Sequence, residues 1–313
     1  MSRRIALIGE CMIEMQGQPQ QEINQTFGGD TFNTAAYLAR LTRDSDIDVQ
    51  YVSGVGTDAF SEAMLARWHE EGVGSALTQR LDNKLPGLYF IQTDPDGERH
   101  FLYWRNDAAA RYMFDGAGAE DMLATLASVN MIYLSGISLA VLTETGRRRL
   151  IETLIKARDN HVRVVFDNNF RARLWSSVDE ARSHYHELLQ YVDVAILTFD
   201  DDQQLFGFAD CDELFAAYEQ FGIEEIVVKR GAESCLVRLK GECVQEVAGE
   251  RVPSERIIDT TAAGDSFSAA YLACRLQGGA PQQAARWGHR LASTVIQHRG
   301  AIMPLDAMPQ MPD

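Results

Sequence analysis

The sequence predicts an α/β protein with a central, mostly parallel sheet flanked by helices and a small β-rich insertion. Short apolar runs, such as residues 5–8, 49–52 and 131–134, alternate with longer stretches of helical periodicity, which is typical of repeated β-α units. The alternation breaks at residues 86–105, where two β-rich runs flank Asp94-Pro95-Asp96-Gly97, a strong turn signal. We therefore expect a hairpin inserted among the β-α units.

The expected strands and helices follow one another in chain order. The strands are short apolar runs, at residues 5–8, 49–52, 131–134, 162–166, 194–197 and 225–229, and then an antiparallel pair at 234–239 and 242–247. The helices carry apolar residues on one face, and begin near residue 28, at 60–71, 142–157, 180–189 and 214–221, after residue 262, and at 281–298. Strands joined through helices in this way form a parallel sheet with right-handed crossovers.

Composition limits the functional classes. Of 313 residues, 29 are Lys or Arg and 45 are Asp or Glu, which gives a net charge of −16 and argues against a nucleic-acid partner. A phosphorylated substrate would need a local basic patch on such a chain. The five cysteines have no metal-binding spacing, and no apolar run approaches the roughly 18 residues of a membrane span. We therefore expect a cytoplasmic protein with no membrane partner.

The stretch from Asp259 to Phe267, Asp-Thr-Thr-Ala-Ala-Gly-Asp-Ser-Phe, places a turn of small residues where a helix begins. The first N–H groups of a helix lack partners inside it and lie at the positive end of its dipole, so small residues there let a phosphate approach. Asp265 would stand beside that phosphate, where a carboxylate can take a proton from an attacking hydroxyl. Taken alone, an Asp at this position is more often only a helix cap.

A second stretch, Gly28-Gly29-Asp30 with Asn33, is suited to binding a polar ligand. Glycine lets a ligand come close to the backbone, and both Asp30 and Asn33 can form hydrogen bonds with hydroxyl groups. The alternative is a Gly-Gly turn in which Asp30 only caps the next helix.

Together these two stretches resemble the C-terminal and N-terminal signatures of the PfkB (ribokinase-like) sugar kinases, in the order and at the separation usual in that family. The resemblance covers nearly the whole chain. It implies a ribokinase-like fold in one domain over residues 1–313, with lid strands from about 11–27 and 86–105. It also leads us to expect a homo-oligomer formed through the lid.

The resemblance assigns roles to both signatures. Asp265 would be the general base, and the backbone amides of Ala262, Ala263 and Gly264 would form an anion hole. The usual motif has a glycine where Ala262 stands, a small departure that should keep the hole. In the N-terminal signature, the residues that contact the sugar would be Gly29, Asp30 and Asn33.

ATP and Mg²⁺ are the cofactors that the resemblance implies, and a monovalent cation stays open. The residues that would face the nucleotide, together with Ala262 and Gly264, are Asn169, Lys229, Gly231, Glu233 and His289. Thr198 and Asp201 stand where the family has an Asn-x-x-Glu motif that acts on Mg²⁺ through water, so Asp201 would take that role. Lys229 could equally be a solvated charge, and His289 could merely pack.

The substrate expectation depends on four residues, Tyr89, Tyr103, Arg105 and Arg171. Two guanidinium groups suit a carboxylate, which a neutral sugar lacks. The pattern also resembles that of kinases for 2-keto-3-deoxygluconate, and this resemblance implies a sugar acid that is phosphorylated at its 6-hydroxyl. A structural alternative is that the tyrosines and Arg105 only form an amphipathic strand face. Fructokinase or another ketose kinase is the alternative activity, and a sugar- or nucleotide-binding relative without catalysis is the alternative of another class.

Overall fold

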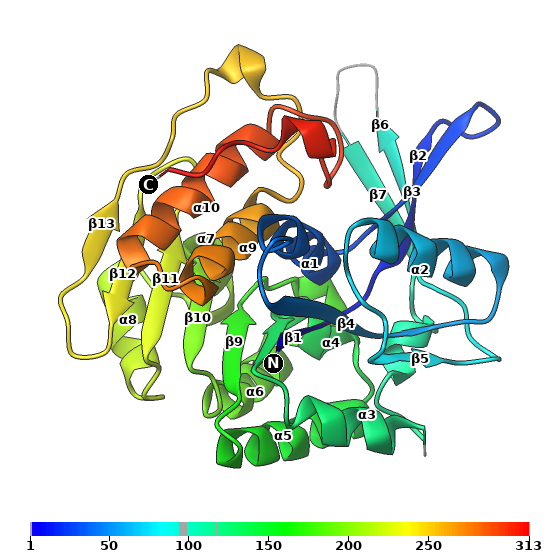
Figure 1. The fold of residues 1–313 in the computed structure, drawn as a ribbon, viewed down its shortest axis with the longest axis horizontal. Coiled ribbons are helices and arrows are strands. Elements are labelled where there is room, and N and C mark those ends of the chain that lie inside the picture. Colours follow the sequence, from blue (N-terminus) through cyan, green and yellow to red (C-terminus); the bar gives the residue numbers. More distant parts are fainter. Residues whose placement is uncertain (1, 94–98, 117, 313) are drawn as a thin grey trace.

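The computed structural model describes residues 2–93, 99–116 and 118–312. Its main sheet has nine strands (Figure 1). From edge to edge they are β13 (Gln245–Val247), β12 (Cys235–Leu239), β11 (Glu225–Lys229), β10 (Val194–Thr198), β9 (Arg163–Asp167), β8 (Met131–Ser135), β1 (Arg3–Ile8), β4 (Ile47–Val55) and β5 (Thr78–Arg80). All neighbours from β11 to β5 pair in parallel, and only β12 and β13 add antiparallel strands.

Helices cover both faces of this sheet, which explains the unbroken apolar runs of its central strands. Along β1, Ile5 and Leu7 pack into one buried cluster, and Ala6 and Ile8 into the other. The first face is covered by α1 (Asp30–Leu41), α2 (Ala59–Glu70), α9 (Ala263–Leu276) and α10 (Pro281–Val295). The second face carries α3 (Ala119–Leu126), α4 (Gly136–Val141), α5 (Glu144–Asp159), α6 (Val178–Leu189), α7 (Phe199–Phe206) and α8 (Cys211–Glu219).

A separate four-stranded sheet projects from the edge of the main body (Figure 1). Its strand order is β3 (Ile23–Gly28), β2 (Met12–Gly17), β6 (Leu88–Thr93) and β7 (Arg99–Trp104). The predicted hairpin is confirmed by the antiparallel pairing of β6 with β7, while its predicted turn at residues 94–97 lies outside the described residues. β2 joins the hairpin in parallel, so strands from two distant segments of the chain form one lid sheet.

The helix expected at 142–157 is confirmed as α5, which begins after its N-cap Thr143. Two short helices before it, α3 and α4, were not expected; the side chain of Ser135 caps α4. α7 was not expected; it follows β10 directly and ends at Gly207, whose left-handed φ of 84° suits a C-terminal glycine.

Among the described residues, no helix combines the length and the apolar character that crossing a membrane requires.

Candidate active site

A cavity of about 1400 Å³ follows the carboxyl edge of the main sheet and extends beneath the lid. This edge is where open α/β sheets bind ligands. All the residues singled out in the sequence line it: Gly29, Asp30, Asn33, Tyr89, Tyr103, Arg105, Asn169, Arg171, Asp201, Lys229, Gly231, Glu233, Ala262, Ala263, Gly264, Asp265 and His289. The fold therefore brings together segments that are more than 200 residues apart in the chain.

The N-terminus of α9 opens onto this cavity. Ala262 is the residue before the helix and adopts a left-handed conformation, with φ 62° and ψ 14°. The first hydrogen bond within the helix runs from the Ser266 amide to the Ala262 carbonyl, at 2.9 Å, so the amides of Gly264 and Asp265 precede the helical ladder. The Ala263 amide bonds to the Thr260 carbonyl at 3.3 Å. Gly264 and Asp265 thus supply the amides best placed for an anion.

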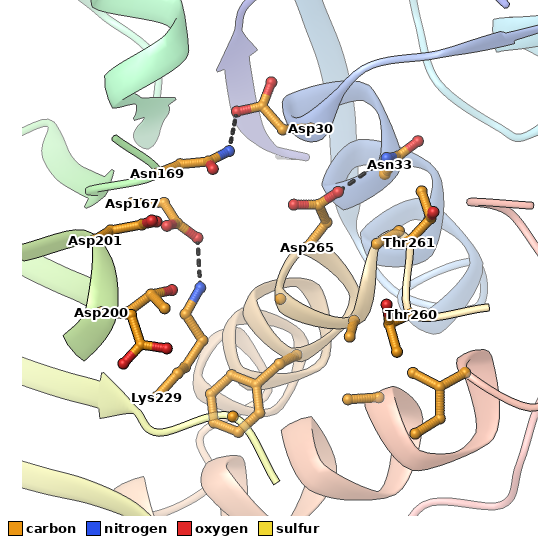
Figure 2. A pocket seen from close by; sticks show the side chains of 18 of the residues that line it. Asp30, Asn33, Asp167, Asn169, Asp200, Asp201, Lys229, Thr260, Thr261 and Asp265 are labelled. Atoms are coloured by element: carbon orange, nitrogen blue, oxygen red, sulfur yellow. Dashed lines mark hydrogen bonds and ion pairs between the residues drawn. The ribbon is translucent and has the colours of Figure 1, made fainter. Parts of the chain in front are cut away.

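Asp265 lies beside this helix end and faces the N-terminal signature (Figure 2). Asn33 Nδ2 donates a hydrogen bond to Asp265 Oδ2 at 2.9 Å. Loss of hydration, and then the nearby charge of Asp30, raise the pKa of Asp265 to about 8. A carboxyl group with a raised pKa has a high affinity for a proton, which is the property a general base needs.

Asp30 is held in place from two strand ends of the main sheet. Ser135 Oγ donates to Asp30 Oδ2 at 2.5 Å, and Asn169 Nδ2 donates to the same oxygen at 2.7 Å. Burial raises the pKa of Asp30 as well. In Figure 2 the Asp30 carboxyl group is directed to Asn169 and the Asp265 carboxyl group to Asn33. Because the charge of Asp30 contributes to the raised pKa of Asp265, the two residues form a pair of interacting acids.

The far end of the cavity is formed by the loop after β11 and by α10. Gly231 has a left-handed φ of 60°, and an added Cβ would meet nothing within 4 Å, so its conformation rather than crowding favours glycine. Glu233 is largely exposed at the rim of the cavity. His289 packs edge-on against Phe267, with ring centroids 5.2 Å apart, and burial lowers its pKa, so the imidazole is neutral near pH 7.

The lid supplies the aromatic and cationic side chains. Tyr89 and Tyr103 stack with ring centroids 5.8 Å apart, and the Tyr89 hydroxyl donates to Glu14. Arg105 is almost fully buried and its Nη2 donates to Glu10. Arg171, across the cavity on the main body, donates to Asp201 at 3.0 Å. Each arginine that was predicted to bind a carboxylate therefore already has an acidic partner in the protein. The partner of Arg171 is Asp201, the residue expected to act on Mg²⁺, and burial raises the pKa of Asp201.

Four residues of the site were given no individual role from the sequence: Glu10, Asp167, Arg173 and Ser268. Arg173 lies with its guanidinium carbon 4.0 Å from the centroid of the Tyr103 ring and so links the main body to the lid. Asp167 accepts hydrogen bonds from Lys229 and Ser268. Asp167 and Arg173 flank Arg171 in the same segment after β9, so their position at a strand end was an available signal. No local sequence pattern identifies Glu10 or Ser268, because their hydrogen-bond partners are 95 and 101 residues away in the chain.

The fold, the open N-terminus of α9 and the acid that faces the N-terminal signature are typical of a phosphotransferase of the ribokinase-like class. The chain belongs to the pfkB family of carbohydrate kinases, whose model matches residues 2–308. It is 53% identical to the 2-dehydro-3-deoxygluconokinase of Dickeya dadantii (strain 3937), over 98% of this chain and 99% of that protein. It is 49% identical to the 2-dehydro-3-deoxygluconokinase of Escherichia coli (strain K12), over 99% of this chain and 100% of that protein.

The same fold is found in a solved structure from Escherichia coli, assigned as a ribokinase II, in complex with ATP and Mg²⁺. That structure has a TM-score of 0.80 and 21% identity, and the match covers 96% of this chain and 94% of that one. The expected ribokinase-like fold with its small β-sheet lid is therefore confirmed.

Proposed function

We propose that this protein is a 2-dehydro-3-deoxygluconokinase, which transfers the γ-phosphoryl group of ATP to the 6-hydroxyl of 2-dehydro-3-deoxy-D-gluconate. The observation that carries the proposal is the position of Asp265, which follows an anion-binding helix end and faces Asp30 and Asn33 across one cavity. The full-length relatives named above support the choice of sugar acid. The reaction would belong to sugar-acid catabolism in the cytoplasm.

The reaction requires one proton transfer and one exchange of P–O bonds. Asp265 takes the proton of the 6-hydroxyl as the hydroxyl oxygen forms a bond to the γ-phosphorus. The bond from that phosphorus to the β–γ bridging oxygen breaks, and ADP leaves with the electron pair. The amides of Gly264 and Asp265 and the dipole of α9 stabilise the negative charge on the group in transfer.

The residues present also fit a magnesium ion. Asp200 and Asp201 line the cavity with carboxylate oxygens, the ligand type that Mg²⁺ prefers. Asp201 would hold the ion through water, and the ion would supply positive charge at the phosphate oxygens of ATP. Asn169, Lys229, Gly231, Glu233 and His289 would line the nucleotide part of the same cavity.

The lid completes the sugar end of the site. Tyr89, Tyr103 and Arg105 would contact the sugar acid from the lid, and Arg171 from the main body. We regard residues 1–313 as one kinase domain with lid segments at about 11–27 and 86–105. The lid also presents apolar side chains to solvent, among them Leu102 at 49% and Trp104 at 60% exposure. These would suit a homo-oligomer formed through the lid.

The test is a coupled assay for ADP release with a substrate panel. We expect turnover with 2-dehydro-3-deoxygluconate and a kcat/KM for it at least tenfold above that for fructose or ribose. Mass spectrometry and NMR of the product should place the phosphate on the 6-oxygen. A preference for fructose would favour the fructokinase alternative, and ATP binding without turnover of any sugar would favour a binding protein.

A further inference from the structure

We infer that the Lys229 ammonium group binds the phosphoryl group during transfer, and that Asp167 and Ser268 are positioning residues that hold it there. The inference rests on the proposed phosphotransferase function and adds a fixed cation to its site. Lys229 is the last residue of β11, at the carboxyl edge of the sheet, and Figure 2 shows its side chain directed to Asp167.

Three buried groups fix the position of this ammonium. Lys229 Nζ donates to Asp167 Oδ2 at 2.8 Å and to Ser268 Oγ at 3.3 Å, and Ser268 Oγ donates to the same Asp167 oxygen at 2.9 Å. The Tyr133 hydroxyl donates to that oxygen as well, at 3.2 Å. Lys229 is only 9% exposed, Asp167 3% and Ser268 0%. A lysine side chain is rarely buried to this degree unless it is paired, so the network holds a charge in place before any ligand binds.

The ammonium lies next to the helix end that would bind phosphate. A Cβ built on Gly264 would be 3.5 Å from Lys229 Nζ, so the charge is in contact range of the anion hole. An ammonium has three N–H donors, and in the described part of the chain two of them have acceptors, Asp167 and Ser268. The third remains for a ligand in the cavity that Lys229 lines.

The neighbouring cation is paired in a different way. Arg230 comes next in the chain, but its guanidinium bonds to the Ser234 carbonyl and to Glu246, on the loop and strand that follow. Lys229 instead crosses from β11 to Asp167 on β9 and Ser268 on α9, the two elements that carry the site. During the reaction Lys229 keeps its three protons and only stabilises the negative charge on the phosphoryl group as one P–O bond forms and the other breaks.

The experiment compares binding of a ground-state ligand with that of a transition-state analogue. Calorimetry would measure the affinity for Mg²⁺–ADP, and for Mg²⁺–ADP with fluoroaluminate, with and without 2-dehydro-3-deoxygluconate. For Lys229→Met we expect ADP affinity within about threefold of wild type, and a loss of about 100-fold both in affinity for the analogue and in kcat. Ser268→Ala should lower both by a smaller factor, because it removes one positioning hydrogen bond and leaves the charge.

Matched variants keep the test decisive. Lys240→Met makes the same substitution at a lysine that is part of the β12–β13 turn and does not line the cavity, so it should leave all constants unchanged. If Lys229→Met does not fold, because Asp167 is left buried and unpaired, the double variant Asp167→Asn with Lys229→Met keeps the site neutral and should show the same selective loss.

Two outcomes would overturn the inference. Equal losses for ADP and for the analogue would make Lys229 a nucleotide contact only, and losses no greater than those of Lys240→Met would make the network structural only. If the wild type turns over another sugar but not the sugar acid, the proposed substrate is contradicted. The comparison of ADP with the transition-state analogue still tests Lys229 in that case. If the wild type does not bind Mg²⁺–ADP with fluoroaluminate under any of these conditions, the inferred role of Lys229 is contradicted.

Discussion

The phosphate end and the lid end of the cavity are built in different ways. At the phosphate end, Asp265 and Lys229 are held by side chains from strands and helices of the core, namely Asn33, Asp167 and Ser268. At the lid end, Arg105 is paired with Glu10, yet Arg105 Nε and Glu10 Oε1 have no hydrogen-bond partner among the described residues. Both regions keep polar atoms for a ligand, among them Asn33 Oδ1 at the phosphate end. The difference is that the acting side chains of the first region are fixed by neighbours in the core, whereas in the second region the ion pair itself is incompletely hydrogen-bonded.

This difference has a physical reason. The groups that act on phosphate do the same chemistry for any acceptor, so preorganising them lowers the barrier at no cost to adaptability. The groups that read the sugar must exchange protein partners for substrate partners. Arg171, with a side chain 43% exposed and paired with Asp201 at 3.0 Å, is suited to such an exchange. From this comparison we expect the core of the fold to determine the reaction, and the lid residues together with Arg171 to determine the substrate.

Replacing Asp265 should have the largest effect. Asp265→Asn removes the base at the preorganised end while keeping the size of the side chain, so kcat should fall by about 10²–10⁴-fold, with ATP affinity nearly unchanged. Steady-state kinetics and calorimetry with ATP would measure the two quantities. Near-normal turnover by a folded variant would remove Asp265 from the mechanism.

The second prediction concerns the lid end. Arg105→Ala should lower kcat/KM for 2-dehydro-3-deoxygluconate by roughly 10- to 100-fold, because a charge-assisted hydrogen bond contributes about 1.5–3 kcal/mol. The value for an uncharged ketose should change much less. Measuring both sugars on wild type and variant separates substrate recognition from general damage.

Glu10 provides the control for that prediction, because Arg105→Ala also leaves its carboxylate buried without a partner. Glu10→Gln keeps the Arg105 charge, and the double variant Glu10→Gln with Arg105→Ala removes the unpaired acid. If the double variant recovers both sugars equally, Arg105 only balances Glu10 and does not bind the carboxylate.

The sequence predicted the phosphate end better than the lid end. The strand–helix alternation and the small residues before α9 are local patterns, and they placed Asp265 and its helix end correctly in the cavity. The pairing of Glu10 with Arg105 and the contact of Arg173 with Tyr103 could not be predicted, because each joins residues that are far apart in the sequence. α7 was missed because it is a short helix of 8 residues that follows β10 without a loop.

The third prediction tests the coupling between the two acids. Loss of hydration and the Asp30 charge raise the pKa of Asp265 to about 8, so in the free enzyme kcat/KM should fall as the pH drops through that region and the base becomes protonated. Asp30→Asn removes the like charge, which should lower the apparent pKa and move the acidic limb to lower pH by about one unit.

The pH profile distinguishes this effect from lost sugar binding, because weaker binding lowers the plateau without moving the inflection. Asp179→Asn, at a surface site where the Asp179 side chain is 90% exposed, removes an equal charge and should leave the profile in place. An unshifted limb in Asp30→Asn would show that Asp30 does not control the proton on Asp265.

The smallest expected effect tests how firmly the phosphate end is built. Ala262 is held at φ 62°, a conformation that costs a residue with a Cβ about 1–2 kcal/mol, and that glycine adopts freely. Ala262→Gly should therefore raise the free energy of unfolding by about 0.5–1 kcal/mol, after the greater entropy of glycine in the unfolded chain is subtracted.

Ala263→Gly is the matched control, because Ala263 is helical and its replacement should lower the free energy of unfolding by up to about 1 kcal/mol. Urea denaturation of both variants would measure these opposite changes in the free energy of unfolding. The kcat of Ala262→Gly should stay within about twofold of wild type, because the amides of Gly264 and Asp265 keep their positions. Equal destabilisation by the two variants would mean that the left-handed turn is not strained, and that the preorganised end stores no conformational energy at Ala262.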